Sequence, residues 1–99
     1  MYLIIWEFEP EPARVAEFEA AYGSQGDWAR LFGRSPEYLG TELLRDTGRP
    51  SRYLTIDRWA STEGFDEFRG RFNREYNQLD SACGALTRRE TLIGRFAIP

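Results

Sequence analysis

The chain has 99 residues and a formal net charge of −3, a size that suits one domain spanning residues 1–99. All 13 basic residues are arginine, so the chain lacks a lysine for Schiff-base chemistry and a histidine for proton transfer or metal binding. The acidic balance argues against a nucleic-acid partner, which needs a basic patch, and 41% hydrophobic residues indicate a globular protein.

The first predicted strand covers residues 2–9 and is apolar on both of its alternating faces. Leu3 and Ile5 share one face, and the opposite face carries Tyr2, Ile4, Trp6 and Phe8. This run is too short for a signal or membrane segment, and no positively charged leader precedes it. We therefore expect a soluble cytoplasmic protein with no membrane partner.

Pro12 suits the first turn of a helix, in which Val15, Phe18 and Tyr22 form one buried stripe before Gly23 ends it. Residues 24–33 carry a second apolar stripe and predict a separate short helix or a kinked continuation. Asp27 is the expected N-cap of that segment. Its Trp28 and Phe32 are bracketed by glycines, which makes them candidates for a mobile flap, although packing on the sheet explains them equally well.

A hairpin is predicted next, with strands Tyr38–Arg45 and Arg52–Trp59 around turn-forming residues 46–50. Ser61 or Thr62 then caps the longest predicted helix, which ends at Gly84. Every step along its apolar stripe is three or four residues, and the stripe consists of Phe65, Phe68, Phe72, Tyr76, Leu79 and Cys83. The last predicted strand is Arg88–Ile98, with Leu92 and Phe96 on one face and Ile93 and Ala97 on the other.

This order of elements, β-α-β-β-α-β, predicts an α+β, ferredoxin-like fold in which a four-stranded antiparallel sheet carries both helices on one face. Two helices cannot cover the second apolar face. A second copy of the chain is the simplest cover, and a standard interface would bury about 800 Å² per subunit. We therefore expect a homodimer in which two sheets pack face to face as a dimeric α/β barrel.

The run Tyr53–Ser61, read with Phe65, Phe68 and the strand Gly40–Arg45, resembles the dimeric α/β-barrel superfamily and in particular the antibiotic biosynthesis monooxygenase-like (ABM) domains. Such domains often place a Trp at the end of the third strand, a Ser or Asp two residues on, and an aromatic residue in the next helix. The resemblance implies a cofactor-independent monooxygenase acting on an aromatic or polyketide-like compound. An isomerase, or a non-catalytic dimer that binds a hydrophobic small molecule or acts as an accessory domain, remains the alternative.

Haem degradation does not fit, because the related haem-degrading domains hold iron through a histidine that this chain lacks. Tyr76 and Cys83 lie at stripe spacing and are more often core residues than haem ligands. Glu42 and Glu90 lie in strands and could join Asp57 in a carboxylate cluster, but the absence of histidine and of a DxD-like spacing argues against a metal site. No cofactor and no metal are expected.

Asp57 is the most specific single signal, because a carboxylate between inward-facing aromatic residues of a strand should be partly buried and have a raised pKa. An ion pair with Arg45 or Arg95, or a hydrogen bond to a Trp or Tyr, is the structural alternative. The predicted catalytic residues are Asp57 and Trp59. The predicted substrate-binding residues are aromatic, as a pocket for a phenol requires, and they are Trp6, Tyr22, Trp28, Phe32, Tyr53, Phe72 and Tyr76.

Overall fold

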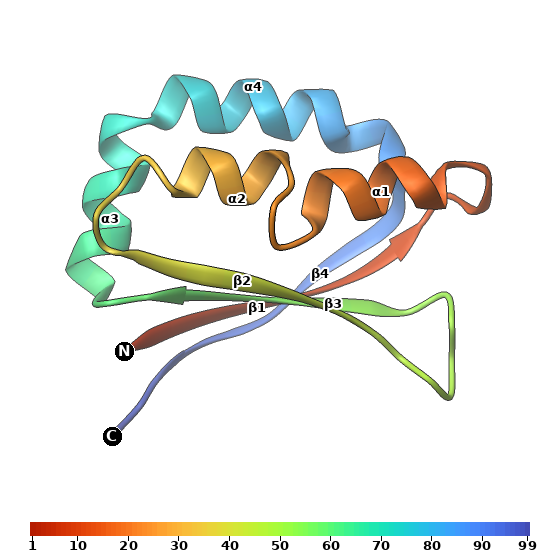
Figure 1. Ribbon diagram of the computed structural model, residues 1–99, viewed down its shortest axis with the longest axis horizontal. Helices are drawn as coiled ribbons and strands as arrows, with labels where there is room; N and C mark the ends of the chain where they lie inside the picture. The colour runs from red at the N-terminus through yellow and green to blue at the C-terminus, as the bar shows by residue number, and fades with distance from the viewer.

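The computed structural model describes all 99 residues and has the predicted two layers, a sheet with every helix on one side (Figure 1). The four strands pair antiparallel in the order β2-β3-β1-β4. This arrangement confirms the ferredoxin-like α+β fold. The elements are β1 (Tyr2–Pro10), η1 (Pro12–Arg14), α1 (Val15–Tyr22), α2 (Asp27–Phe32), β2 (Tyr38–Arg45), β3 (Tyr53–Trp59), α3 (Thr62–Arg71), α4 (Asn73–Cys83), η2 (Gly84–Leu86) and β4 (Thr87–Ala97).

The helix ends follow local side-chain and backbone chemistry. Ser61 caps α3, because its hydroxyl accepts a hydrogen bond from the Gly64 N–H at 3.0 Å. Gly23 ends α1, as expected, and its backbone N–H donates a hydrogen bond to Glu19 O. The predicted N-cap of α2 was wrong by one residue: Gly26 occupies that position, and Asp27 is the first helical residue.

The long helix predicted from Ser61 to Gly84 is broken at Phe72, which separates α3 from α4. Phe72 has φ −109° and ψ 28°, outside the helical region, and the chain changes direction there (Figure 1). A straight helix of that length would be about 33 Å long, and its apolar stripe could contact the sheet only along one direction. The break lets α3 pack against β3 while α4 runs beside α2 on the same side of the sheet.

A β-bulge in β4 also corrects the predicted strand faces. Ile5 pairs with Gly94 and Trp6 with Leu92, so Ile93 is an extra residue in the ladder. The insertion reverses the alternation on either side of it. Leu92 therefore shares the helix-covered face with Trp6, whereas Phe96 lies opposite Leu3 on the other face.

The core lies between the sheet and the helices and is largely aromatic. Trp59, Phe18 and Phe68 are its most completely buried large side chains. The opposite sheet face has no helix over it (Figure 1). It leaves Leu3, Ile5, Leu54 and Ile56 half-buried and Leu44 and Phe96 exposed. None of the helices is both long enough and apolar enough to cross a membrane.

Candidate functional site

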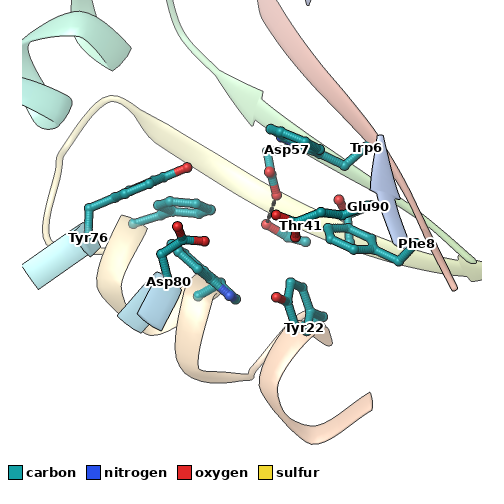
Figure 2. Close-up of a pocket in the computed structure, with 11 residues that line it drawn as sticks. Trp6, Phe8, Tyr22, Thr41, Asp57, Tyr76, Asp80 and Glu90 are labelled. Carbon is teal, nitrogen blue, oxygen red and sulfur yellow. Dashed lines mark hydrogen bonds between the residues drawn. The ribbon is translucent and has the colours of Figure 1, made fainter. Parts of the chain in front are cut away.

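A cavity of about 140 Å³ opens between the helix-covered face of the sheet and α1, α2 and α4. All four strands and these three helices contribute side chains to it, as Figure 2 shows. Aromatic residues dominate the walls, and the polar groups are hydroxyls, carboxyls and indole N–H groups, of which Trp28 Nε1 is buried without a hydrogen-bond partner. The lining consists of Trp6, Phe8, Tyr22, Trp28, Phe32, Thr41, Thr55, Asp57, Tyr76, Asp80 and Glu90.

Strand register explains why the sheet residues of this set meet. Thr41 is the cross-strand partner of Asp57, and Trp6 is the partner of Thr55. Directly opposed residues in an antiparallel pair project from the same face of a sheet. Phe8 and Glu90 are paired in the same way between β1 and β4. The floor of the cavity is therefore set by backbone pairing and not by loops.

Asp57 lies in the floor of the cavity with only 7% of its surface exposed. Thr41 Oγ1 donates a hydrogen bond to Asp57 Oδ1 at 2.6 Å, and the Tyr38 hydroxyl lies 2.5 Å from Thr41 Oγ1. Because the Thr41 proton is directed at Asp57, Tyr38 is the donor to Thr41. Burial raises the pKa of Asp57 to about 6, and the Thr41 hydrogen bond opposes this effect.

The predicted structural alternatives for Asp57 do not form. Arg45 donates to Pro50 O at 3.1 Å, and Arg95 approaches the Tyr2 hydroxyl at 3.5 Å. The partner of Asp57 is the neutral hydroxyl of Thr41, which leaves the carboxyl without a counter-charge. The expected burial of this residue is confirmed.

The helix-side wall is a set of contacting rings. Trp28 makes an edge-to-face contact with Tyr76, with ring centroids 4.9 Å apart, and tilted contacts with Phe32 at 5.7 Å and Tyr22 at 6.2 Å. Burial raises the pKa of the Tyr22 and Tyr76 hydroxyls, so both stay protonated at neutral pH. Trp28 and Phe32 are themselves buried, which favours the packing explanation for them over the flap hypothesis.

Two further carboxyl groups, Asp80 and Glu90, lie at the solvent-exposed rim (Figure 2). Partial burial, with the nearby charge of Asp80, raises the pKa of Glu90. Among the lining residues, Phe8, Thr41, Thr55 and Asp80 were missed as site candidates, and Glu90 was considered only for a metal. Asp80 had a usable signal, since it lies one helical turn after Tyr76 on the same face.

Three predicted site residues lie outside the cavity. Trp59 is fully buried in the core between Phe32, Tyr38, Phe65 and Phe68. Tyr53 is also buried, and its hydroxyl donates to a Glu19 carboxyl oxygen. Phe72 marks the break between α3 and α4 and packs on Phe68. The structure brings together Asp57 with Trp6, Tyr22, Trp28, Phe32 and Tyr76.

Metal-ligating side chains do not cluster anywhere in the chain: no group of three or more His, Cys, Asp or Glu residues has the proximity that a metal ion needs. Cys83 is a free, buried thiol whose pKa is raised by burial. Glu42, the other carboxylate considered for a metal, is exposed and bonded to Arg58.

The family model for antibiotic biosynthesis monooxygenases matches residues 1–72 of this chain. A variant of SnoaB, a cofactor-independent oxygenase from Streptomyces nogalater, superposes with a TM-score of 0.76 at 23% identity, covering 98% of this chain and 91% of that chain. A candidate antibiotic biosynthesis monooxygenase from Bordetella bronchiseptica gives a TM-score of 0.73 at 19% identity, covering 99% and 96%. Rv0793 from Mycobacterium tuberculosis gives a TM-score of 0.72 at 17% identity, covering 99% of this chain and 94% of that chain. No protein with curated annotation matches the chain in sequence.

Proposed function

Because the chain belongs to the antibiotic biosynthesis monooxygenase family, we propose that it is a cofactor-independent monooxygenase for a small aromatic compound. The observation that carries the proposal is the position of Asp57, a buried carboxyl with a pKa of about 6 on the floor of an aromatic cavity. At neutral pH such a group is largely ionised, yet basic enough to accept a proton from an acidic phenol. SnoaB, the similar structure described as a cofactor-independent oxygenase, supports this class of reaction.

In the proposed reaction Asp57 takes the phenolic proton, and the electron-rich phenolate then reduces molecular oxygen directly. One oxygen atom enters a ring carbon, which loses its hydrogen, and the other oxygen atom leaves as water. A phenol and O2 thus give a quinone and water, with all electrons supplied by the substrate. The protein's part is to deprotonate, orient and shelter the ring.

The cavity volume limits the part of the substrate that enters. A cavity of about 150 Å³ is known to accept benzene, and the volume here is about 140 Å³. One aromatic ring therefore fits beside Asp57, and further rings of a polyketide-like compound would have to extend past Asp80 and Glu90. We propose a monocyclic phenol, or the terminal ring of a larger one, as the reacting group.

The uncovered sheet face supports a second part of the proposal, a homodimer. Leu3, Ile5, Leu54 and Ile56 lie together on this face, where no helix covers them. Pairing two such faces removes them from water, at about 25 cal/mol for each Å² buried. A second copy is the proposed cover, in keeping with the resemblance to the dimeric α/β-barrel superfamily.

Oxygen uptake tests the proposed reaction. Chelator-treated protein is mixed with a series of monocyclic phenols and hydroquinones, and initial oxygen consumption above the protein-free rate is recorded together with quinone formation. We expect Asp57→Asn to lower turnover by about 100-fold or more, because a positioned general base contributes at least this much. Asp66→Asn, an exposed change on α3 outside the cavity, is the matched control.

Equal turnover by the wild type and Asp57→Asn would remove Asp57 as the base. Binding of phenols by the wild type without any oxygen consumption would instead favour the non-catalytic, small-molecule-binding alternative.

A further inference from the structure

We propose that the cavity is built for an aromatic compound that carries a protonated amine. The inference rests on the proposed function in one respect, namely that this cavity is the substrate site. It specifies the substrate further, as an organic cation and not merely a phenol. Three features of the cavity support this ligand: the charge of the lining, the unfilled hydrogen-bonding capacity of Asp57 and the aromatic walls.

Every ionisable lining residue that can carry charge near neutral pH is acidic: Asp57, Asp80 and Glu90. The chain has 13 arginines, and none of them lines the cavity. The chain's salt bridges use eight other carboxylates and none of these three. The lining therefore carries negative charge that the protein leaves without an ion-pair partner.

Four arginines lie near the cavity, and none of them forms an ion pair with its carboxyls. Arg88 and Arg89 border an adjoining depression that also includes Asp80 and Glu90, and Arg88 pairs with Glu9 and Glu11. Arg69 stacks on Tyr76, with its Cζ 3.7 Å from the ring centroid, and Arg95 lies over Phe65 at 5.3 Å. Both lie close enough for their charges to oppose the rise that burial causes in the pKa of Tyr76, and neither forms an ion pair with a cavity carboxyl. A positive charge on the ligand would form the ion pair with the cavity carboxyls that these arginines do not form.

Asp57 gives an observation that is independent of the two rim carboxyls. Its side chain is more than nine-tenths buried and lines the cavity, and the chain donates a hydrogen bond only to Oδ1. Oδ2 is left for the ligand. An ionised buried carboxyl without a second donor is unfavourable, and an N–H or O–H donor on the ligand relieves this cost.

The aromatic walls suit the same ligand. Trp6, Trp28 and Tyr76 line the cavity together with the carboxyls, and the negative faces of such rings attract cations. Aromatic rings combined with carboxylates form a site for organic ammonium groups, whereas a phenolate alone would face the two rim carboxylates, Asp80 and Glu90, once Asp57 has taken its proton. An ammonium group on the same molecule offsets that repulsion while Asp57 removes the phenolic proton.

Binding of three matched ligands tests the inference without any need for turnover. The ligands share a para-substituted phenol and differ in charge: 4-hydroxyphenethylamine is a cation, 4-(2-hydroxyethyl)phenol is neutral, and 3-(4-hydroxyphenyl)propionate is an anion. Quenching of the fluorescence of Trp6 and Trp28 reports occupancy, and calorimetry checks the stoichiometry. At pH 7.5 and low salt we expect the amine to bind about tenfold more tightly than the alcohol, and the acid to bind most weakly.

A pair of double variants locates the origin of the preference. Asp80→Asn with Glu90→Gln removes both rim charges, and we expect the amine and the alcohol to bind this variant within about twofold of each other. Asp66→Asn with Glu67→Gln makes the same change of net charge on the exposed face of α3 and should keep the tenfold preference. All four positions are exposed, so folding should be unaffected, and circular dichroism verifies this.

Three results would overturn the inference: equal binding of the three ligands, no binding of any of them up to millimolar concentration, or a preference for the amine that survives loss of the rim charges. Its failure is distinguishable from failure of the proposed function. Tight amine binding without oxygen consumption would support the cationic ligand and contradict the monooxygenase activity. Turnover of neutral phenols with no charge preference would support the monooxygenase activity and contradict the cationic ligand.

Discussion

Replacement of Asp57 by Asn should make the protein more stable at pH 8, although it removes the proposed catalytic base. The pKa of Asp57 is about 6 in the folded chain, compared with an ordinary value of 3.8. The folded state therefore holds this proton more tightly than the unfolded state. Its stabilising contribution is complete below about pH 4 and is lost as the pH rises through 6.

The size of this effect follows from the difference of about two pKa units. At 1.36 kcal/mol for each unit, ionisation of Asp57 costs about 3 kcal/mol of folding free energy at pH 8. Asparagine has nearly the same shape, its amide oxygen can accept the Thr41 hydrogen bond, and it does not ionise. We expect Asp57→Asn to exceed the wild type by up to about 3 kcal/mol at pH 8, with the difference smallest near pH 4.

Urea unfolding at fixed protein concentration, followed by tryptophan fluorescence between pH 4 and 8, measures this difference. Asp46→Asn is a control of opposite sign, because the N–H of Gly48 and the guanidinium of Arg52 lower the pKa of Asp46. That variant should lose stability throughout this pH range, because the folded pKa of Asp46 lies below its ordinary 3.8 and the carboxylate stays ionised down to pH 4. If Asp57→Asn matches the wild type at pH 8, or if the gap is independent of pH, the reasoning about Asp57 is wrong.

Thr41→Val removes the donor that lowers the pKa of Asp57, so the acid limb of the pH–rate profile should move to higher pH, whereas Thr41→Ser should leave it nearly in place. Gly26→Ala would place a methyl group 2.6 Å from Ala21 O, and we expect a loss of about 1–3 kcal/mol in denaturant unfolding. Gly70→Ala, in an open position within α3, should gain about 0.5–1 kcal/mol in the same assay. Ile56→Asp places a charge on the uncovered sheet face and should convert a dimer to single protomers in sedimentation velocity.

Each of these outcomes has a clear opposite. An unchanged acid limb in Thr41→Val would show that the hydroxyl does not control Asp57. Equal stability of the two glycine variants would contradict the close approach at Gly26. A wild-type protein that sediments as one protomer at micromolar concentration would contradict the proposed dimer.

The floor of the site was predictable because strand alternation is strong where one face is buried. In β3 the inward residues Tyr53, Thr55, Asp57 and Trp59 follow strict alternation, and the single carboxylate among them stood out. Alternation identifies a face but not a position along the strand. From the sequence, Trp59 was therefore as good a candidate site residue as Trp6. In the structure Trp59 is fully buried in the core and does not line the cavity.

The remaining differences arise where tertiary packing overrides a regular period. The stripe from Phe65 to Cys83 is continuous, so periodicity gives no sign of the break at Phe72. The bulge at Ile93 has no composition signal in an apolar strand, and it alone decides the face of Leu92. Thr41 was missed because its importance comes from register with Asp57, which the sequence of one strand does not contain.

The most direct test of the central claim is an NMR titration of the Asp57 side-chain carboxyl carbon, assigned by its disappearance in Asp57→Asn. A midpoint near 6 in the ligand-free protein is the predicted result, because burial on the cavity floor is the largest cause of the raised pKa. A midpoint close to the ordinary 3.8 would show that Asp57 is well solvated or paired, and would contradict its assignment as the base.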